Sequence, residues 1–200
     1  MYKLQNKYSF WDKIKLSIFW GRTKLIDGRV RLFRFPIAIH GREFIDFGEK
    51  LTTGVGCRFD CFGNLNNSIK LKFGKNVQLN DYVHIVAMEN VYVGDNVLMA
   101  SHVFISDNSH GSYNCNFLDS DPRIPPTERD YVTAPVKICG NVWIGEGVCI
   151  MPGVTIGEGC VIGAHSIVSR DIPAFSIAVG TPAKVIKLYN FETKHWEKVE

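Results

Sequence analysis

An aliphatic residue recurs at every sixth position in the second half of the chain. A helix repeats at about 3.6 residues and an isolated strand at about 2, so a period of six requires a different object. A coil of short strands joined by tight corners has such a period, because each step places one bulky side chain inward. The pattern therefore predicts a parallel β-helix in which each strand pairs with its equivalent one coil away. The clearest series is Ile138, Ile144, Ile150, Ile156, Ile162 and Val168.

The same spacing occurs upstream, which extends the predicted coil to residues 45–187. A sandwich of short strands is disfavoured, because it predicts turns roughly every 8–12 residues and no constant register. A weaker set consists of Ile45, Leu51 and Cys57. Two clear sets follow, Leu71, Val77 and Val83, and then, after a shift of two residues in the register, Val91, Val97 and Val103.

The period disappears between Ile105 and Val132, which predicts a protruding loop over residues 107–131. A loop of this length inside a regular solenoid is expected to be functional or disordered, and polar residues followed by prolines favour a loop with a defined shape. His110 is its first candidate, because a neutral imidazole acts as a general base near neutral pH. Taken alone, a loop histidine is also compatible with a solvated side chain that has no role.

The two ends differ from the coil, and sheet edges that stay open invite aggregation unless they are covered. Residues 1–44 are basic and aromatic, with ten Lys or Arg against two Asp in residues 1–42. Ser9 to Asp12 predicts the start of a short helix that carries Phe10, Trp11, Ile14 and Ile18 on one side. This segment is either a cap on the coil, or a surface for an anionic membrane or an acidic polymer, and both can hold. Residues 188–200 are predicted to form a helical tail.

Composition limits the classes of protein. The chain has 200 residues, 46% of them hydrophobic, which suits one folded domain. Its net charge of +3 is too weak to indicate nucleic-acid binding. No apolar run reaches the length of a membrane span. The start lacks the apolar core of a signal peptide, so we expect a cytoplasmic protein, at the inner face of the membrane if the N-terminal segment binds there.

The cysteines and histidines do not suggest a metal site. The six cysteines show neither a CxxC pair nor zinc-type spacing, so we expect reduced and mostly buried thiols. His84 precedes the inward position Ile85 by one residue, whereas His102 precedes Ile105 by three. The two imidazoles therefore do not share a column, and no metal is expected.

Five segments together carry a resemblance to a known family. They are Asn141-Val142-Trp143-Ile144-Gly145, residues 152–157 (PGVTIG), residues 161–164 (VIGA), residues 166–168 (SIV) and residues 180–186 (GTPAKVI). The chain resembles the hexapeptide-repeat acyltransferases over residues 71–187, above all the galactoside, maltose and surface-polysaccharide O-acetyltransferases. The resemblance implies an all-β left-handed parallel β-helix, a homotrimer and acetyl-CoA as the donor. Residues 1–45 have no evident counterpart in it.

The resemblance also implies roles for single residues. His110 falls where the family carries its catalytic histidine, and Asn80 matches an asparagine that contacts the acceptor sugar. Tyr113 is a further candidate for acceptor binding. Two departures are Glu146, which replaces a small residue, and Lys184, which stands where arginine is usual; an acceptor-binding aspartate near the family's N-terminus has no match. The positions implied for the coenzyme groove and its phosphates are Ala100, Trp143, Glu146, Ala164, Ser169, Lys184 and Lys187.

The expected reaction is acetyl transfer from acetyl-CoA to a sugar hydroxyl of a bacterial surface polysaccharide or its precursor. His110 would remove the hydroxyl proton, with Glu128 as a candidate to orient its ring. The backbone N–H of Ala100 or Ser101 would stabilise the oxyanion. Direct transfer is favoured over an acetyl-cysteine, because the coil cysteines lie within the repeat and only Cys115 lies in the loop. A xenobiotic (antibiotic) O-acetyltransferase, an amine acceptor and a non-catalytic hexapeptide scaffold remain alternatives.

Overall fold

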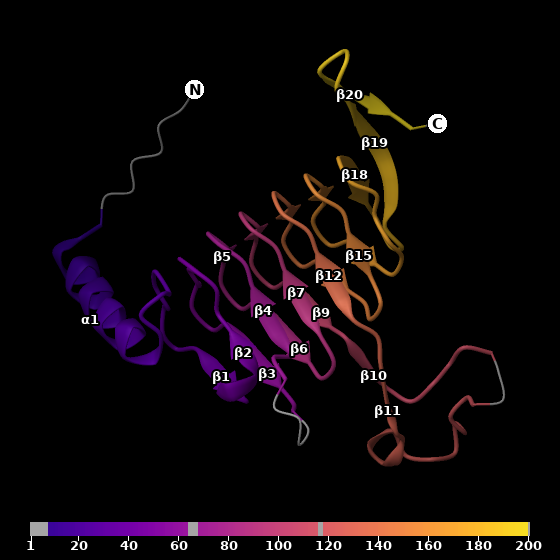
Figure 1. Ribbon diagram of the computed structural model, residues 1–200, viewed down its shortest axis with the longest axis horizontal. Helices are drawn as coiled ribbons and strands as arrows, with labels where there is room; N and C mark the ends of the chain where they lie inside the picture. The colour runs from indigo at the N-terminus through magenta and orange to yellow at the C-terminus, as the bar shows by residue number, and fades with distance from the viewer. Residues whose placement is uncertain (1–7, 64–67, 116–117, 200) are drawn as a thin grey trace.

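Three parallel sheets run the length of the molecule, and the chain passes through them in rotation (Figure 1). The computed structural model describes residues 8–63, 68–115 and 118–199. Each strand pairs in parallel with the strand of the same sheet in the next coil, for example β6 with β9 and β9 with β14. The predicted arrangement of parallel strands is therefore confirmed.

The sheets are named here in the order in which the chain visits them. The first sheet contains β2 (Ile45–Asp46), β4 (Leu71–Phe73), β7 (Val91–Val93), β12 (Val136–Ile138) and β15 (Thr155–Ile156). The second contains β5 (Gln78–Leu79), β8 (Leu98–Met99), β13 (Trp143–Ile144), β16 (Val161–Ile162) and β18 (Ser176–Val179). The third contains β1 (Ala38–His40), β3 (Arg58–Cys61), β6 (His84–Ala87), β9 (Phe104–Ser106), β14 (Cys149–Ile150) and β17 (Ile167–Val168).

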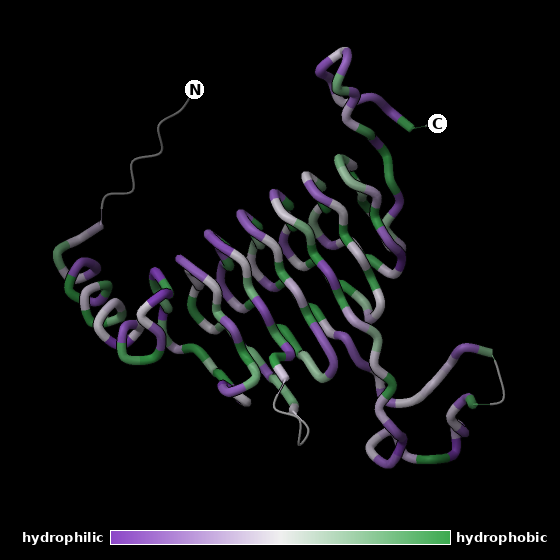
Figure 2. The backbone as a smooth tube through the Cα atoms, in the orientation of Figure 1, coloured by the Kyte–Doolittle hydropathy of each residue, from purple (hydrophilic) through white to green (hydrophobic). Residues whose placement is uncertain are grey.

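The six-residue series forms the core. Ile138 pairs with Ile156, and Ile144 with Ile162, so the aliphatic positions stack one coil apart. Every member of that series is at most 1% exposed, and hydrophobic segments recur along each coil (Figure 2). Burying one such side chain stabilises the fold by about 1.5–3 kcal/mol. Each side of the coil thus takes six residues and buries one such aliphatic side chain, which explains the period of six.

Asparagines form a ladder along one corner. Asn76, Asn96 and Asn141 each adopt a left-handed backbone conformation, with φ between 56° and 59°. The Asn96 side-chain amide donates to Asn141 Oδ1 at 3.2 Å, and Asn141 donates to Glu158 Oε1 at 3.0 Å. Asparagine tolerates this conformation better than most residues, which explains its recurrence where the chain turns from one sheet into the next.

Three insertions, two long and one short, leave the coil at the same corner, between the third sheet and the first. They follow β3, β6 and β9, and the short one after β6 accounts for the slip of two residues in the periodicity. The longest begins with β10 (Asn108–His110) and returns through η2 (Pro126–Glu128) and β11 (Tyr131–Thr133). Strands β10 and β11 are antiparallel and form the base of the loop (Figure 1). The insertions therefore lie one above another along one edge of the third sheet.

The N-terminal helix α1 (Phe10–Ile26) begins where the Ser9–Asp12 pattern predicts, at a capping box formed by these two residues. Its buried residues are Phe19 and Thr23, and Thr23 Oγ1 accepts a hydrogen bond from the Phe33 N–H at 2.8 Å. A short 3-10 helix, η1 (Arg42–Phe44), follows β1. The described part of the chain contains no helix with the length and hydropathy that crossing a membrane requires.

The start of the coil differs from the expectation of residue 45. Leu32 already pairs with Thr52, and β1 pairs with β3 in the third sheet. The first coil therefore lies within residues 1–44. Its aliphatic signal is weak because Phe33 takes a core position there, and phenylalanine is outside the aliphatic series.

The expectation of a helical C-terminal tail is wrong. Strand β19 (Lys184–Asn190) adds to β18 in antiparallel orientation, and β20 (His195–Lys198) adds to β19. An open strand edge offers unpaired N–H and C=O groups, which a returning strand satisfies better than a separate helix would. Tyr189 packs against the rings of Phe191 and Trp196. A boundary at residue 187 would cut through β19.

Candidate active site

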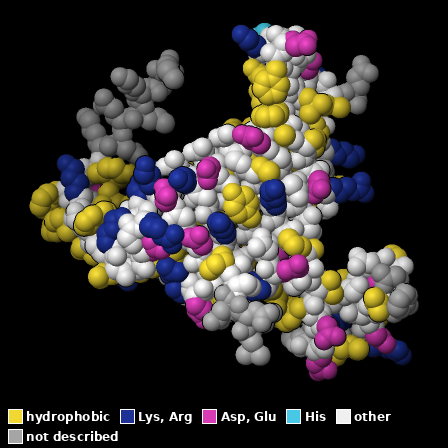
Figure 3. Space-filling view, viewed as in Figure 1, with side chains coloured by type: hydrophobic (Ala, Val, Ile, Leu, Met, Phe, Trp, Pro, Cys, Tyr) yellow, Lys and Arg dark blue, Asp and Glu magenta, His cyan; other side chains and the backbone are white. Residues whose placement is uncertain are grey.

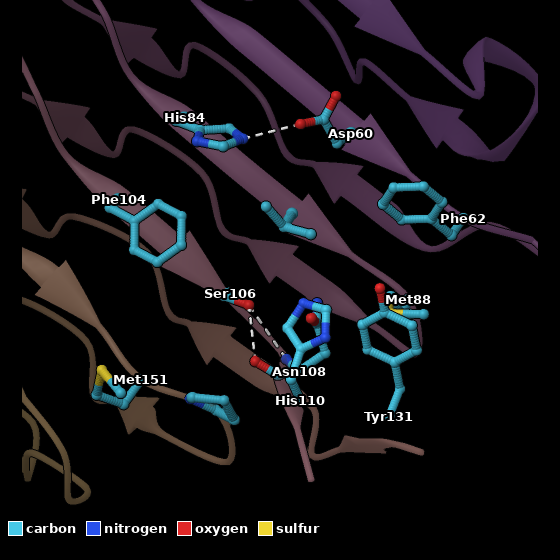
Figure 4. Close-up of a pocket in the computed structure, with 12 residues that line it drawn as sticks. Asp60, Phe62, His84, Met88, Phe104, Ser106, Asn108, His110, Tyr131 and Met151 are labelled. Atoms are coloured by element: carbon cyan, nitrogen blue, oxygen red, sulfur yellow. Dashed lines mark hydrogen bonds and ion pairs between the residues drawn. The ribbon is translucent and has the colours of Figure 1, made fainter. Parts of the chain in front are cut away.

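A cavity of about 400 Å³ lies on the outer face of the third sheet, next to the base of the loop (Figure 4). Its floor consists of outward side chains from successive coils, and the loop contributes one wall. Apolar groups such as Phe62, Phe104 and Met151 alternate in it with polar groups. The residues that carry its polar chemistry are Asp60, His84, Ser106, Asn108 and His110.

His110 is the last residue of β10 and lines this cavity. Its partner across the loop base is Tyr131, whose ring centroid lies 4.6 Å from that of the imidazole. Within the described part of the chain, neither ring nitrogen of His110 is hydrogen bonded, and no ion pair joins it to Glu128. The structure therefore does not support Glu128 as the group that orients the ring, and the packing of Tyr131 limits the ring's position instead.

Asp107 anchors the start of the loop. Its side chain is fully buried, and its carboxylate accepts hydrogen bonds from the backbone N–H groups of Met88, Glu89 and Asn90 at 2.8–3.1 Å. The Asn108 side chain donates to it at 3.2 Å. The Asp107 carboxylate thus ties the loop to the insertion after β6, three residues before His110. Sequence reasoning missed this role, whose one signal is an acidic residue two positions after Ile105, the last periodic residue before the loop.

A second cluster in the cavity is centred on Asp60, which is 5% exposed. Three donors reach its carboxylate: His40 Nδ1 of β1 at 2.6 Å, His84 Nε2 of β6 at 2.9 Å, and Arg58 Nε of the same strand, β3, at 2.6 Å. Burial alone would raise the pKa of Asp60, but hydrogen bonds from His40, His84 and Arg58 together hold this pKa below its ordinary value. The periodicity does not predict this cluster, because the six-residue repeat constrains the residue type only at inward positions.

The Asp60 contact also determines how His84 faces the cavity. A neutral imidazole that donates through Nε2 keeps Nδ1 as an acceptor. His84 lines one end of the cavity, whereas His110 lies at the loop end (Figure 4). A hydroxyl-rich molecule between the two would meet an imidazole at each end.

Asp60→Asn is expected to destabilise the protein by about 1–3 kcal/mol at neutral pH, because hydrogen bonds to a charged group are lost. The folded pKa of Asp60 is lowered, so its stabilising effect is full above the unfolded pKa of about 3.9 and is lost as pH falls through the folded pKa. Urea unfolding of both proteins at neutral and acidic pH measures this difference. A difference that stays constant on acidification would contradict the assignment.

Tyr113 does not line the cavity that contains His110. Its hydroxyl donates to the His110 carbonyl and accepts from Arg129 Nη1 at 2.7 Å. Arg129 also donates to the Ile124 carbonyl at 2.8 Å. These bonds hold the loop in shape, so the hydroxyl is already engaged, and acceptor binding by Tyr113 stays a prediction.

Two of the residues predicted to bind substrates share a column at the corner after the second sheet. Asn80 follows β5 and Ala100 follows β8, and each N–H donates to the neighbouring coil at 2.9 Å. The Ala100 N–H bonds the Ile144 carbonyl, so it is not available to an oxyanion, and Ser101 remains the candidate. Glu146 and Ala164 lie one residue further along in the next coils, and the Glu146 carbonyl accepts from the His165 N–H.

The other predicted coenzyme residues lie elsewhere on the coil. Trp143 is in β13 and is 54% exposed. Ser169 follows β17 in the third sheet, and Lys184 and Lys187 belong to β19. Neither these residues nor those of the corner column line the cavity with His110. A single chain does not bring them together, and their roles stay predictions.

The cysteines fit a structural role. Cys57, Cys61 and Cys160 are buried, Cys139 and Cys149 are partly buried and Cys115 is exposed; all six are free thiols. Burial raises the pKa of Cys57 to about 11 and that of Cys61 to about 12. Thiols of such high pKa are poor nucleophiles at neutral pH. Among the described residues, no group of three His, Cys, Asp or Glu side chains is placed to hold a metal ion.

Comparison with known proteins identifies the class. The family model for bacterial transferase hexapeptide (six repeats) matches residues 135–170. The chain is 43% identical over 196 residues, 98% of each protein, to the "Putative lipopolysaccharide biosynthesis O-acetyl transferase WbbJ" of Escherichia coli (strain K12). It is 39% identical over 177 residues to the galactoside O-acetyltransferase of the same strain, covering 86% of this chain and 83% of that protein.

A solved structure shares the fold. The N-acyltransferase AntD from Bacillus cereus, in complex with dTDP and 3-hydroxybutyryl-CoA, superposes with a TM-score of 0.69 at 21% identity over 88% of this chain and 92% of its own. The chain belongs to the hexapeptide-repeat transferases. Within that family it is an acyltransferase, as the sequence motifs predicted. The match to WbbJ also covers the N-terminal segment, so the expectation that residues 1–45 lack a counterpart is wrong.

Proposed function

We propose that the protein transfers an acetyl group from acetyl-CoA to a sugar hydroxyl of a bacterial surface polysaccharide or its precursor. The near full-length similarity to WbbJ and the similarity to the galactoside O-acetyltransferase support this reaction. The single observation that carries it is an imidazole, His110, at a cavity whose wall is anchored by the buried Asp107.

In this mechanism His110 acts as the general base. The sugar hydroxyl oxygen attacks the thioester carbonyl while its proton passes to the imidazole. The new C–O bond forms, the C–S bond breaks, and the imidazolium returns the proton to the departing thiolate of coenzyme A. Histidine suits this task, because an imidazole can take up and return a proton within one catalytic cycle. His84 would accept a hydrogen bond from a second hydroxyl and so orient the acceptor.

We further propose a left-handed coil and a homotrimer, both properties of the family that the chain resembles. General rules for parallel crossovers favour the right hand, so the family alone supports this handedness. The trimer is supported by the separation of His110 from the predicted coenzyme residues, which do not line the same cavity in one chain. In a trimer, a neighbouring chain would supply the other wall of the groove. Sedimentation equilibrium of the purified protein tests this assembly, and a monomeric species that is fully active would contradict it.

An acceptor panel tests the reaction itself. Purified protein, acetyl-CoA and free sugars, oligosaccharides, chloramphenicol-type compounds or amino sugars are incubated, and released thiol and product mass are followed. Acetylated oligosaccharide is the expected product. Transfer only to chloramphenicol-type compounds would favour the xenobiotic enzyme, and transfer only to amines an N-acetyltransferase. A chain that neither binds coenzyme nor transfers acetyl would be a scaffold.

Cys115→Ser is expected to retain near-normal turnover, because direct transfer needs no thiol. Cys115 is the exposed cysteine of the loop and therefore the one to test. The measurement is the steady-state rate with acetyl-CoA and an acceptor that the panel has shown to become acetylated. Loss of activity in a folded variant would revive an acetyl-cysteine intermediate.

A further inference from the structure

Helix α1 has a continuous apolar stripe that faces away from the coil. At about 100° per residue, Phe10, Trp11, Ile14, Ile18 and Leu25 fall within one arc of the helix surface. All five are exposed, from 37% for Ile14 to 89% for Leu25. Figure 3 shows hydrophobic side chains, in yellow, at the α1 end of the molecule, next to dark-blue cationic groups. A stripe of this kind is costly in water unless something covers it.

The opposite face of α1 explains why the stripe is available. Phe19 is 8% exposed and Thr23 is fully buried, and both lie on the side that contacts the coil. Phe19 packs against Phe35 with ring centroids 5.5 Å apart. The helix therefore caps the coil with one face and presents the other outward, which leaves the apolar stripe accessible to a partner.

Cations border the stripe on both sides. By helical geometry Lys13 flanks one edge and Lys15 the other. Lys24 and Arg22 lie on the same two sides, but the Lys24 ammonium donates to the Gly28 and Val30 carbonyls and the Arg22 guanidinium lies over the Phe35 ring. Asp12 is the one acidic residue of α1, and it is engaged in the capping box at the helix start. The surface around the stripe thus has a net positive charge, which a neutral apolar partner would not require.

A groove beside α1 adds two further cations. It has a volume of about 810 Å³ and lies between the helix and the first coils. Leu16 and Trp20 of α1 line one part of it, and Arg31 and Arg34 line another. An apolar wall next to two guanidinium groups is suited to the boundary between acyl chains and phosphate headgroups.

We propose that α1 lies in the interface of a membrane rich in anionic lipids and holds the protein there peripherally. The stripe would enter the boundary between headgroups and acyl chains, while Lys13 and Lys15 extend to the headgroup phosphates. Attraction to an anionic leaflet contributes about 1 kcal/mol per basic side chain near the surface. This inference is independent of acetyl transfer, since it concerns binding alone.

Vesicle flotation of the full chain tests the proposal. The probes are vesicles of phosphatidylcholine alone and vesicles with about one-third phosphatidylglycerol, at low and high salt. We expect binding to the anionic vesicles that weakens with salt, and little binding to phosphatidylcholine. Trp11→Ser with Leu25→Ser should weaken binding about tenfold or more for each side chain. Lys13→Glu with Lys15→Glu should weaken it about fivefold for each lysine.

Matched controls lie at the far end of the coil. Phe191 is 61% exposed, so Phe191→Ser removes a comparable apolar group, and Lys194→Glu with Lys198→Glu reverses two charges in β20 and its turn. These variants should bind anionic vesicles like the wild type. Circular dichroism and thermal melts verify that all variants fold.

Three results would overturn the proposal. The first is absence of binding to anionic vesicles, and the second is binding that the α1 substitutions leave unchanged. The third is a wild type that forms an oligomer and does not bind vesicles, together with a Trp11→Ser, Leu25→Ser double variant that does not form the oligomer. That combination would show that the stripe contacts a second copy of the chain. Acetyl transfer to a soluble acceptor, measured in parallel, separates each result from a failure of the proposed reaction.

Discussion

His110→Ala is expected to lower kcat by about 10²–10⁴-fold while acetyl-CoA binding stays nearly unchanged. The imidazole lines the cavity next to the outward side chains of the third sheet, where an acceptor hydroxyl would lose its proton. Without a base, the hydroxyl attacks the thioester only in its weakly nucleophilic neutral form. Steady-state kinetics separate kcat from KM, and calorimetry measures coenzyme binding.

Two other histidines serve as controls for that result. His195 lies in β20, far along the chain from the cavity, and His195→Ala should have full activity. His84 lines the same cavity, and His84→Ala should mainly raise the KM for the acceptor. A His110 variant with near-wild-type turnover would remove His110 from the mechanism, and a collapse of kcat in the His84 variant would assign the base to the Asp60–His84 pair.

Asp107→Ala is expected to lower the free energy of unfolding by about 3 kcal/mol or more, because three backbone N–H groups lose their acceptor. The carboxylate is fully buried, so water does not replace it without opening the loop base. We also expect a large drop in kcat, since His110 follows the anchor by three residues. Urea unfolding and kinetics on the same samples measure the two effects.

Asp121→Ala provides the matched control. Asp121 is in the same loop, but its carboxylate pairs with Arg123 on the surface, and exposed pairs contribute little to stability. If Asp107→Ala is too unstable to purify, Asp107→Asn retains the shape and removes the charge, and it should show the same effects in weaker form. An Asp107 variant with normal stability and activity would contradict the anchoring role.

The two effects have one physical origin. A rigid coil provides the floor of the cavity, whereas His110 lies on an excursion that could adopt many positions. Its base is held by the β10–β11 pairing and by the Asp107 carboxylate. Preorganisation of this kind is what allows a general base to act without reorganising in each turnover.

The order of aliphatic residues alone determined the coil, its inward positions, the site of the long loop and the histidine within it. Each side of the coil repeats the same backbone geometry, so the demand for one buried side chain per side appears directly as a period of six. The motifs around Trp143 and the segment 180–186 added the family. The helix start at Ser9 followed from local capping chemistry, which is equally short in range.

Only the tertiary structure decided the contacts between outward side chains. Asp60 meets His40 and His84 from 20 and 24 residues away, and Asp107 meets the N–H groups of residues 88–90. These separations depend on the lengths of the insertions between coils, which obey no period. The strand form of residues 184–190 likewise depends on the open edge of β18, which exists only once the coil has formed. Inward positions are constrained by every coil in the same way, whereas outward positions are constrained only by the neighbours that the insertions place beside them.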